Sequence, residues 1–299
     1  MVIESASGQS YENFMQEHIF KPLGLTQTFA NREYAEQSSR LAQGYATNFV
    51  FLTTPKDSPE AGGMVPTGYL ISSARGMSRW MGIQLGIIED IPVIFTELIT
   101  RSHIIDQSVT SHSWRGVDSY YAAGWSVSLD RSRIEHEGNV PSFATYVLLL
   151  PKEQIGIAVF SNMAQLNPFS IADSVAEILG GNLEQSYSMD SEQIADIVFT
   201  LITVLGSLLA ILFVFLGLHR KKQNTILTVS KKRLALIICW SVITLGMGVL
   251  CYFFPWLIVR GTWQLAVTFY SYSILTGLIT LVLLSACITW FVSFPRRTV

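Results

Sequence analysis

Three long runs without a charged residue, in the last third of the chain, constrain the fold most strongly. They cover residues 197–218, 234–259 and 261–295. A helix needs about 20 apolar residues to cross a hydrocarbon core of ~30 Å. A buried helix of a large soluble protein is the alternative, but such apolar runs rarely exceed about 18 residues. We therefore expect three transmembrane helices, at about 197–218, 234–259 and 264–294.

Basic residues beside these runs predict their orientation. They cluster at Arg220, Lys221 and Lys222, at Lys231, Lys232 and Arg233, and at Arg296 and Arg297, while Arg260 stands alone on the other side. The positive-inside tendency places the loop 219–233 and the C-terminus in the cytoplasm. We expect a multi-pass protein of the cell membrane, with the lipid bilayer as a partner and residues 1–190 outside the cytoplasm. No charged residue lies within the three runs, which favours anchoring over transport.

The remainder of the chain has the composition of a soluble domain. Residues 1–190 carry a net charge of −9 and residues 191–299 one of +7. The cysteines, Cys239, Cys251 and Cys287, all lie in the apolar runs, so no disulfide is expected in the first part. This pattern favours an exported bacterial domain. However, the first ten residues have neither the basic nor the apolar region of a signal peptide.

The strongest strand signal lies in residues 134–163. Apolar residues fill 147–150 and 155–160, with a turn predicted at 151–154, as in buried central strands. Upstream, we expect a helix capped by Ser10, a second that begins at Ser72 or Ser73, a third over 87–105, and a strand over 120–129. A closing helix is expected over 168–179, with Ile171, Val175, Ile178 and Leu179 on one side. Helices, adjacent strands and a closing helix together predict an α+β fold.

Several stretches, taken in order, resemble the serine β-lactamase-related family, which includes class C β-lactamases, penicillin-binding DD-peptidases and related esterases. The stretches are SGQSYENFMQEHIFKPLGL (7–25), LAQGY (41–45), AGGMVPTGYLISSARGMSRWM (61–81), AAGW (122–125), HEGNVPSF (136–143) and LLLPKEQIGIAVFSN (148–162). The resemblance implies a β-lactamase/transpeptidase-like domain with an antiparallel sheet and helices. It also implies a peptidoglycan-like peptide, a β-lactam or an ester as the substrate.

One of the family's three motifs is present. His136-Glu137-Gly138 matches the His-x-Gly form of the third motif, which closes the pocket along a strand. By resemblance, His136 positions substrate and polarises the proton-transfer network, and Gly138 lets the substrate backbone approach. Glu137 and Asn139 are then candidates for substrate binding. The competing interpretation is a histidine at a strand end without a catalytic role.

The family's nucleophile motif is missing. No lysine of the chain has a serine three residues before it, so Ser-x-x-Lys does not occur. Tyr11-Glu12-Asn13 spells Tyr-x-Asn but falls on the apolar stripe of a helix, downstream of the family's true motif. We therefore expect an N-terminally truncated domain over residues 1–181, a linker over 182–196 and a membrane region over 197–299. Exposed apolar surface and open sheet edges should follow from the missing part.

Three functions remain open on the sequence. The chain is a remnant of a serine hydrolase that is inactive alone, a non-catalytic membrane-anchored binding or sensor module of the cell envelope, or one half of an enzyme whose N-terminal half is supplied in trans. No HExxH or CxxC motif and no Walker or Rossmann glycine loop occurs. We expect no metal and no cofactor. Basic residues that cluster do so beside the apolar runs, so nucleic-acid binding is not expected.

Overall fold

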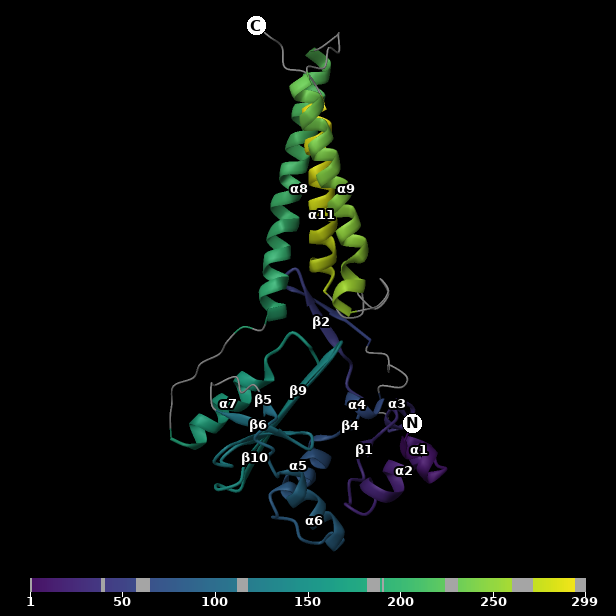
Figure 1. The fold of residues 1–299 in the computed structure, drawn as a ribbon, viewed down its shortest axis with the longest axis vertical. Coiled ribbons are helices and arrows are strands. Elements are labelled where there is room, and N and C mark those ends of the chain that lie inside the picture. The colour runs from purple at the N-terminus through teal and green to yellow at the C-terminus, as the bar shows by residue number, and fades with distance from the viewer. Residues whose placement is uncertain are drawn as a thin grey trace. The chain divides into compact units, whose positions relative to one another are not determined.

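The computed structural model describes residues 2–38, 41–57, 65–111, 118–181, 189, 191–223, 231–259 and 271–293. The chain divides into two compact units (Figure 1). The globular unit comprises residues 1–45 and 57–188, and the helical unit comprises residues 46–56 and 189–299. A short segment from the first part of the chain thus belongs with the apolar helices, which the sequence did not predict.

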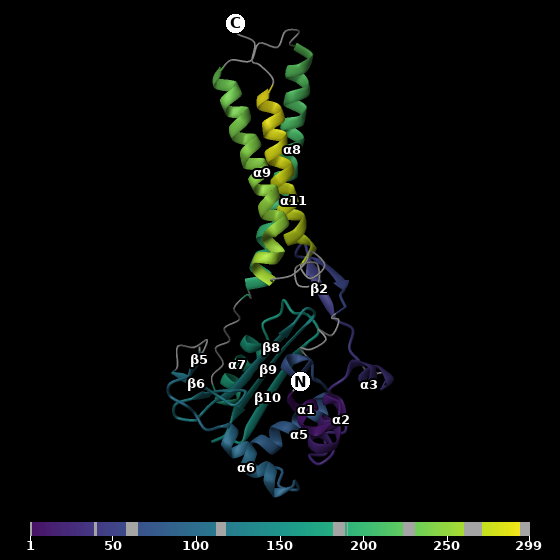
Figure 2. The ribbon, with the colours of Figure 1, turned by 45° about the vertical axis from the view of Figure 1, so that its right-hand side comes forward.

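The globular unit is built on a six-stranded antiparallel sheet with the order β10-β9-β8-β7-β6-β5. Figure 2 shows its three longest strands side by side. The strands are β5 (Thr110–Ser111), β6 (Ser119–Ala122), β7 (Trp125–Ser128), β8 (Ile134–Val140), β9 (Phe143–Leu150) and β10 (Ile155–Ser161). The strands expected in 134–163 are confirmed. The single strand expected over 120–129 is wrong, because Gly124 takes a φ of +89° and folds this segment into the hairpin β6–β7.

Apolar side chains cover both faces of this sheet. On one face, Trp125, Val127, Ile134, Val147 and Leu149 form a buried cluster, against which Met77, Met81 and Leu85 pack. These methionines belong to α5 (Ala74–Gln84). On the other face, Tyr146, Leu148 and Ile157 pack with Ala172, Phe169 and Ala176 of α7 (Pro168–Leu179). The sheet is therefore a central layer between two helices, as the α+β prediction requires.

Helix α7 contacts the sheet through a side other than the one that carries its large apolar residues. The predicted stripe, Ile171, Val175, Ile178 and Leu179, is exposed, with Leu179 at 58%. The small side chains of Ala172 and Ala176 face the sheet instead, since they allow the helix to approach closely. The outer side of α7 therefore presents an exposed apolar surface.

Short helices make up the rest of the described globular unit. These are α1 (Val2–Ser7), α2 (Tyr11–Met15), the π-helix η1 (Gln16–Phe20), α3 (Arg32–Gln37), α4 (Val65–Gly68) and α6 (Val93–Ser102), with a small sheet of β1 (Thr28–Phe29) and β4 (Ile71–Ser72). Ser10 and Ser73 cap α2 and α5 as predicted. Tyr11 is 5% exposed and belongs to a buried cluster with Phe20, Leu23 and Ile83. The third predicted helix is shorter than 87–105, since Pro92 holds the N-cap position of α6.

The helical unit contains α8 (Ser191–Gln223), α9 (Lys231–Val259) and α11 (Tyr272–Ser293), together with the hairpin of β2 (Tyr45–Asn48) and β3 (Leu52–Pro55), except that Tyr45 belongs to the globular unit. Two segments, Gln193–Lys222 and Tyr272–Val292, are long and apolar enough to cross a membrane. The apolar stretch of α9 among the described residues, Leu234–Gly246, is shorter. Two of the three expected spans therefore meet the criterion, not three. Part of the third expected span, residues 264–270, lies outside the described residues.

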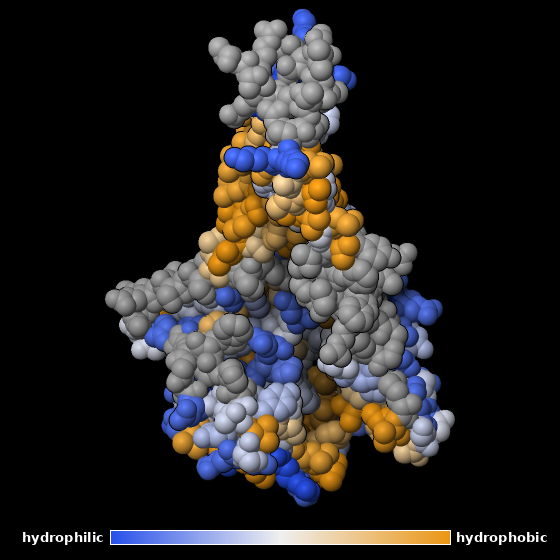
Figure 3. All heavy atoms as spheres, turned by 45° about the horizontal axis from the view of Figure 1, so that its top comes forward, coloured by the Kyte–Doolittle hydropathy of each residue, from blue (hydrophilic) through white to orange (hydrophobic). Residues whose placement is uncertain are grey.

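Small residues let α8 and α11 approach each other closely. A Cβ added at Gly206 would lie 2.8 Å from Thr280, one at Gly277 would lie 2.6 Å from Phe199, and one at Gly217 would lie 2.3 Å from Trp290. Such glycine contacts are typical of helix pairs in lipid, where packing rather than water exclusion drives association. Hydrophobic residues, orange in Figure 3, cover much of the described part of the helical unit that faces the viewer.

Candidate active-site wall

The candidate site lies on the second half of β8, where the strand extends beyond its neighbour. Strand β7 pairs with β8 at Ser126–Glu135 and Val127–Ile134, and the described ladder stops there. Strand β9 pairs with β8 along its whole length, up to Val140–Phe143. Beyond Glu135, β8 therefore presents one side of its backbone away from β9. An extended chain can add to such an edge through main-chain hydrogen bonds.

His136 is the first residue of this projecting half. Its side chain is exposed, and its ring lies edge-on to Trp125, with the ring centroids 6.3 Å apart. Trp125 is 7% exposed and belongs to the cluster that α5 covers. The buried indole of Trp125 therefore packs against the imidazole of His136 on the sheet side, and the solvent-facing side of the imidazole is accessible to a ligand.

Gly138 lies two residues further along, so its missing side chain would point to the same face as His136. A Cβ built on Gly138 would lie 2.7 Å from Oγ1 of Thr145, its partner residue on β9. The Thr145 hydroxyl also donates a long hydrogen bond of 3.5 Å to the Gly138 carbonyl. Only glycine fits here without movement of Thr145, and its absent side chain keeps this part of β8 flat.

Glu137 and Asn139 occupy the alternate positions of β8. They pair with Tyr146 and Ala144 of β9, so their side chains share the face of Glu135 rather than that of His136. The four residues selected from the sequence thus lie on one strand but divide between its two faces. Glu137 and Asn139 therefore lie on the face opposite His136, and they can contact a ligand at the β8 edge only if the ligand also extends to that face. Substrate binding by Glu137 and Asn139 stays a prediction.

His103, which the sequence did not single out, completes the ring cluster on the first face. It follows α6, and its ring lies edge-on to Trp125 with the centroids 5.8 Å apart. Its Nε2 is 2.8 Å from Oε1 of Gln84, a buried residue at the end of α5. Burial, and secondarily the charge of Arg131, holds the pKa of His103 below its usual 6.5. Trp125 therefore contacts both the half-buried imidazole of His103 and the exposed one of His136. The sequence signal for Trp125 was the AAGW stretch, whereas nothing marked His103.

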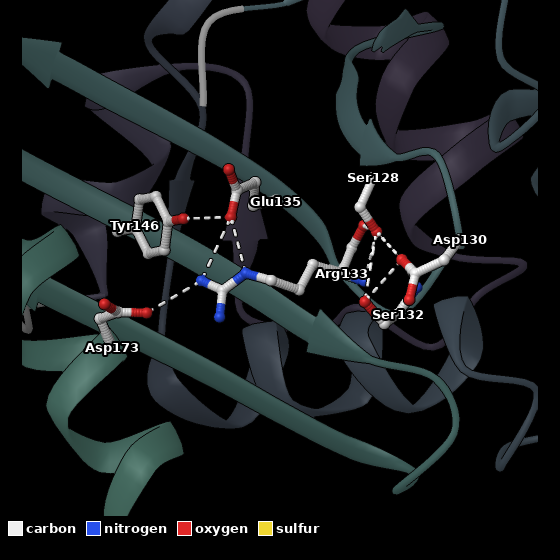
Figure 4. A network of polar contacts seen from close by, with 7 residues as sticks. All are labelled: Ser128, Asp130, Ser132, Arg133, Glu135, Tyr146 and Asp173. Atoms are coloured by element: carbon white, nitrogen blue, oxygen red, sulfur yellow. Dashed lines mark hydrogen bonds and ion pairs between the residues drawn. The ribbon is translucent and has the colours of Figure 1, made fainter. Parts of the chain in front are cut away.

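A buried ionic network fixes the start of β8 on its opposite face (Figure 4). Arg133 Nη2 lies 3.0 Å from Asp173 of α7 and 3.4 Å from Glu135. The Tyr146 hydroxyl donates a hydrogen bond of 2.6 Å to the same Glu135 oxygen. Burial, together with the negative charge of Glu135, raises the pKa of Tyr146. The network joins β8, β9 and α7, and so holds the strand that carries His136.

The turn before β8 is also fixed by polar contacts. Ser128 and Ser132 donate hydrogen bonds of 2.8 Å and 2.7 Å to Asp130 Oδ1, which also accepts the Ser132 backbone N–H. These hydrogen bonds, led by the Ser132 hydroxyl, hold the pKa of the Asp130 carboxyl well below its usual range. Arg131 takes a φ of +54° at the tip. Residues 130–132 therefore form a fixed turn between β7 and β8, and this turn sets the register of β8 against β7.

Among the described residues, no group of three or more His, Cys, Asp and Glu side chains is arranged to hold a metal ion. The residues described at the wall supply an imidazole, a strand edge and the side chains that support them. These can align an extended substrate and exchange a proton with it, but they include no activated hydroxyl.

An antiparallel sheet between helices, with a His-x-Gly strand that projects at its edge, defines a β-lactamase/transpeptidase-like domain. The Beta-lactamase family model matches residues 1–181, and the chain belongs to this family. The penicillin-binding protein homologue from Pyrococcus abyssi has a similar fold, with a TM-score of 0.52 and 24% identity over 60% of this chain and 40% of that one.

Two curated relatives extend the comparison. Protein flp of Staphylococcus aureus strain MW2 is 26% identical over 94% of this chain and 55% of its own length. Unguisins hydrolase ungD' of Aspergillus campestris is 27% identical over 53% of this chain and 30% of its own length. The match to Protein flp takes in the helical unit as well as the globular one, since it covers nearly the whole chain. This chain spans about half the length of Protein flp.

Proposed function

We propose that this chain forms the third-motif wall and the membrane anchor of a serine acyl-hydrolase of the β-lactamase family. One observation carries the proposal: the half of β8 beyond Glu135 projects past β7, with His136 and Gly138 on one face. An acyl substrate with an extended backbone can lie antiparallel to this edge. The His136 imidazole then stands beside the scissile group, where it orients the substrate and takes part in proton transfer.

This wall of the active site does not include the nucleophile that attacks the acyl group of the substrate. A serine hydroxyl is a weak nucleophile until a base takes its proton, and no Ser-x-x-Lys occurs in residues 1–299. The nucleophile therefore comes from a polypeptide segment outside these residues. Two surfaces of the globular unit suit such a segment. They are the exposed apolar side of α7 and strand β10, which ends the sheet and carries a 43% exposed Phe160.

The helices supply the anchor in this proposal. The apolar window of α8 has a mean hydropathy of 2.8 and is only 6% buried, whereas a core helix of a soluble protein is mostly buried. Arg220, Lys221 and Lys222 close α8, and Lys231 and Lys232 open α9. With α9 as a third span, the positive-inside tendency places these basic ends in the cytoplasm and residues 1–190 outside. The candidate substrates are then a peptidoglycan-like peptide, a β-lactam or an ester.

Acylation tests the proposal directly. The purified chain should not react with a fluorescent penicillin or a fluorophosphonate. Co-expression with the polypeptide encoded immediately upstream, if it carries Ser-x-x-Lys, should restore labelling of that serine. His136→Ala should then reduce the labelling rate by ~10²–10⁴, the usual contribution of positioned proton transfer. Labelling of the chain alone, or an unchanged rate in the variant, would refute the assigned roles.

A non-catalytic binding module is the second candidate. It is favoured by the three buried hydrophobic clusters of the globular unit, which show a packed interior despite the missing motif. In this case the chain alone binds a cell-wall peptide, and His136→Ala weakens that binding. Calorimetry with the full chain in detergent micelles distinguishes the two candidates, since the enzyme wall should bind measurably only with its complementing segment.

A further inference from the structure

The hairpin β2–β3 is fastened to the ends of two apolar helices by buried polar contacts. Asn48 Oδ1 accepts the backbone N–H of Tyr272, the first residue of α11, at 2.7 Å. Asp196 of α8 accepts the backbone N–H of Val50 at 2.7 Å through Oδ2, and the Ser273 hydroxyl through Oδ1. Asn48, Asp196 and Ser273 are at most 3% exposed. The hairpin is therefore a fixed part of the helical unit.

The tip of this hairpin is apolar and exposed. Phe51 is 84% exposed, Val50 51% and Leu52 46%. Phe49 and Val50 also take φ values of +53° and +69°, a left-handed conformation that is costly for bulky and β-branched residues. Glycine or asparagine is usual in such turns. The chain thus holds three large apolar side chains outward on a rigid, strained turn.

The contact between Val50 and Asp196 sets the depth of the tip along α8. Counting about 20 residues back from Leu218, the last apolar residue before His219, places the outer edge of the hydrocarbon core near Phe199. Asp196 then lies about 4–5 Å further out, at 1.5 Å per residue. The headgroup zone on each side is ~5–7 Å thick. Asp196 and the hairpin tip therefore fall within this zone.

We propose that the tip Val50-Phe51-Leu52 inserts into the outer headgroup region of the lipid bilayer and acts as an interfacial anchor beside the helices. This inference rests on the proposed membrane insertion of α8. Aromatic side chains favour the membrane–water interface, and apolar groups held there bury ~5–10 Å deep. The buried contacts of Asn48 and Asp196 hold the end of β2 and the backbone of Val50, so the side chains of the tip remain available to lipid.

Lipid-based quenching tests the proposal. The full chain, with Cys239, Cys251 and Cys287 replaced by alanine, is given one new cysteine, labelled with an environment-sensitive nitrobenzoxadiazole dye, and placed in phosphatidylglycerol–phosphatidylcholine vesicles. The label at Phe51→Cys should shift its emission to the blue. It should lose more fluorescence to a spin label near the headgroup than to one at the end of the acyl chain.

Two control positions make the outcomes distinct. Leu208, in the middle of α8 and 59% exposed, should be quenched by the deep spin label. Val93 on α6 is as exposed as Phe51, at 84%, and should remain unquenched. An unquenched label at Leu208 overturns the proposed membrane insertion itself. If the label at Leu208 is quenched and the label at Phe51 is not, only the hairpin inference is overturned. The same holds if the emission of the label at Phe51 shifts to the blue, which shows shielding from water, but the lipid spin labels do not quench it. Equal quenching at Val93 shows non-specific adsorption and also overturns it.

Discussion

The guanidinium of Arg133 lies 3.0 Å from the carboxylate of Asp173, 40 residues away, and both side chains are largely buried. The same guanidinium also neutralises Glu135, so one cation balances two buried anions. This arrangement joins the start of β8 to α7, and the strand that carries His136 depends on it.

Arg133→Met should destabilise the globular unit strongly, because it leaves Asp173 and Glu135 without their cation. Loss of one partner of a buried ion pair typically costs about 3–5 kcal/mol. Urea unfolding of the detergent-solubilised chain, followed by tryptophan fluorescence, measures the change. The matched control is Arg101→Met, which breaks an exposed pair with Glu97 at 3.7 Å. Exposed pairs contribute about 0–1 kcal/mol, so equal effects of the two variants would contradict the assigned network.

The pKa of His103 predicts a loss of stability in acid. Its folded-state pKa lies below the usual 6.5, since burial disfavours the charged ring. Between the folded-state pKa and 6.5, the unfolded chain binds more protons, so the free energy of unfolding falls as pH decreases through that window. His103→Gln and His103→Phe should each flatten this part of the profile. Unfolding midpoints at several pH values below 6.5 provide the measurement, and a profile unchanged in both variants would exclude His103 as the source.

Much of the sheet could be predicted from the sequence because its strands carry long apolar runs. The runs 147–150 and 155–160 and the intervening turn gave β9 and β10 directly. The helix starts at Ser10 and Ser73 also followed from local capping chemistry. In these cases, residues close in sequence determine the structure. The sequence also led to His136 on its strand, through the family resemblance.

The other features depend on contacts between distant residues, which periodicity does not reveal. The sequence placed Ile171 and Val175 on one side of α7 but did not show that this side is exposed, because the close approach of Ala172 to the sheet decides the orientation of the helix. The partners Arg133 and Asp173 are 40 residues apart, and Asn48 and Tyr272 are 224 residues apart. Asp196 stood next to a predicted span, yet no local pattern indicated that it holds a hairpin.

Gly138→Ala should disturb β8, because the added Cβ would lie 2.7 Å from Oγ1 of Thr145. Overpacking of this kind typically costs about 1–3 kcal/mol. Thr145→Ala removes the clashing oxygen, so the double variant should recover most of the loss, and unfolding of all four proteins gives the coupling energy. Gly68→Ala is the control, since its added Cβ meets nothing within 4 Å. Additive effects of the two β8–β9 substitutions would show that the contact is not the cause.

Gly217→Ala should weaken the packing of α8 against α11, because its Cβ would lie 2.3 Å from the Trp290 ring. The matched control is Gly246→Ala on α9, where the added Cβ meets nothing within 4 Å. Removal of a helix glycine there should be neutral or stabilising by up to about 1 kcal/mol. Heating in detergent followed by size-exclusion chromatography compares the two. A Gly217→Ala protein as heat-resistant as the Gly246→Ala protein would contradict the close contact.

Asn48→Ala should loosen the start of α11, because the Asn48 side chain caps that helix from another part of the chain. Its Oδ1 accepts the Tyr272 N–H, and its Nδ2 donates to Thr54 Oγ1 at 3.0 Å within the hairpin. Removal of a cap costs about 0.5–2 kcal/mol. Because 1.4 kcal/mol corresponds to a factor of ten, amide hydrogen exchange at Tyr272 should accelerate by roughly 2- to 30-fold. Thr53→Ala, on the same hairpin and exposed, should leave this exchange unchanged. If Asn48→Ala leaves it unchanged as well, the hairpin does not secure α11, and Asp196 alone must hold the tip in place.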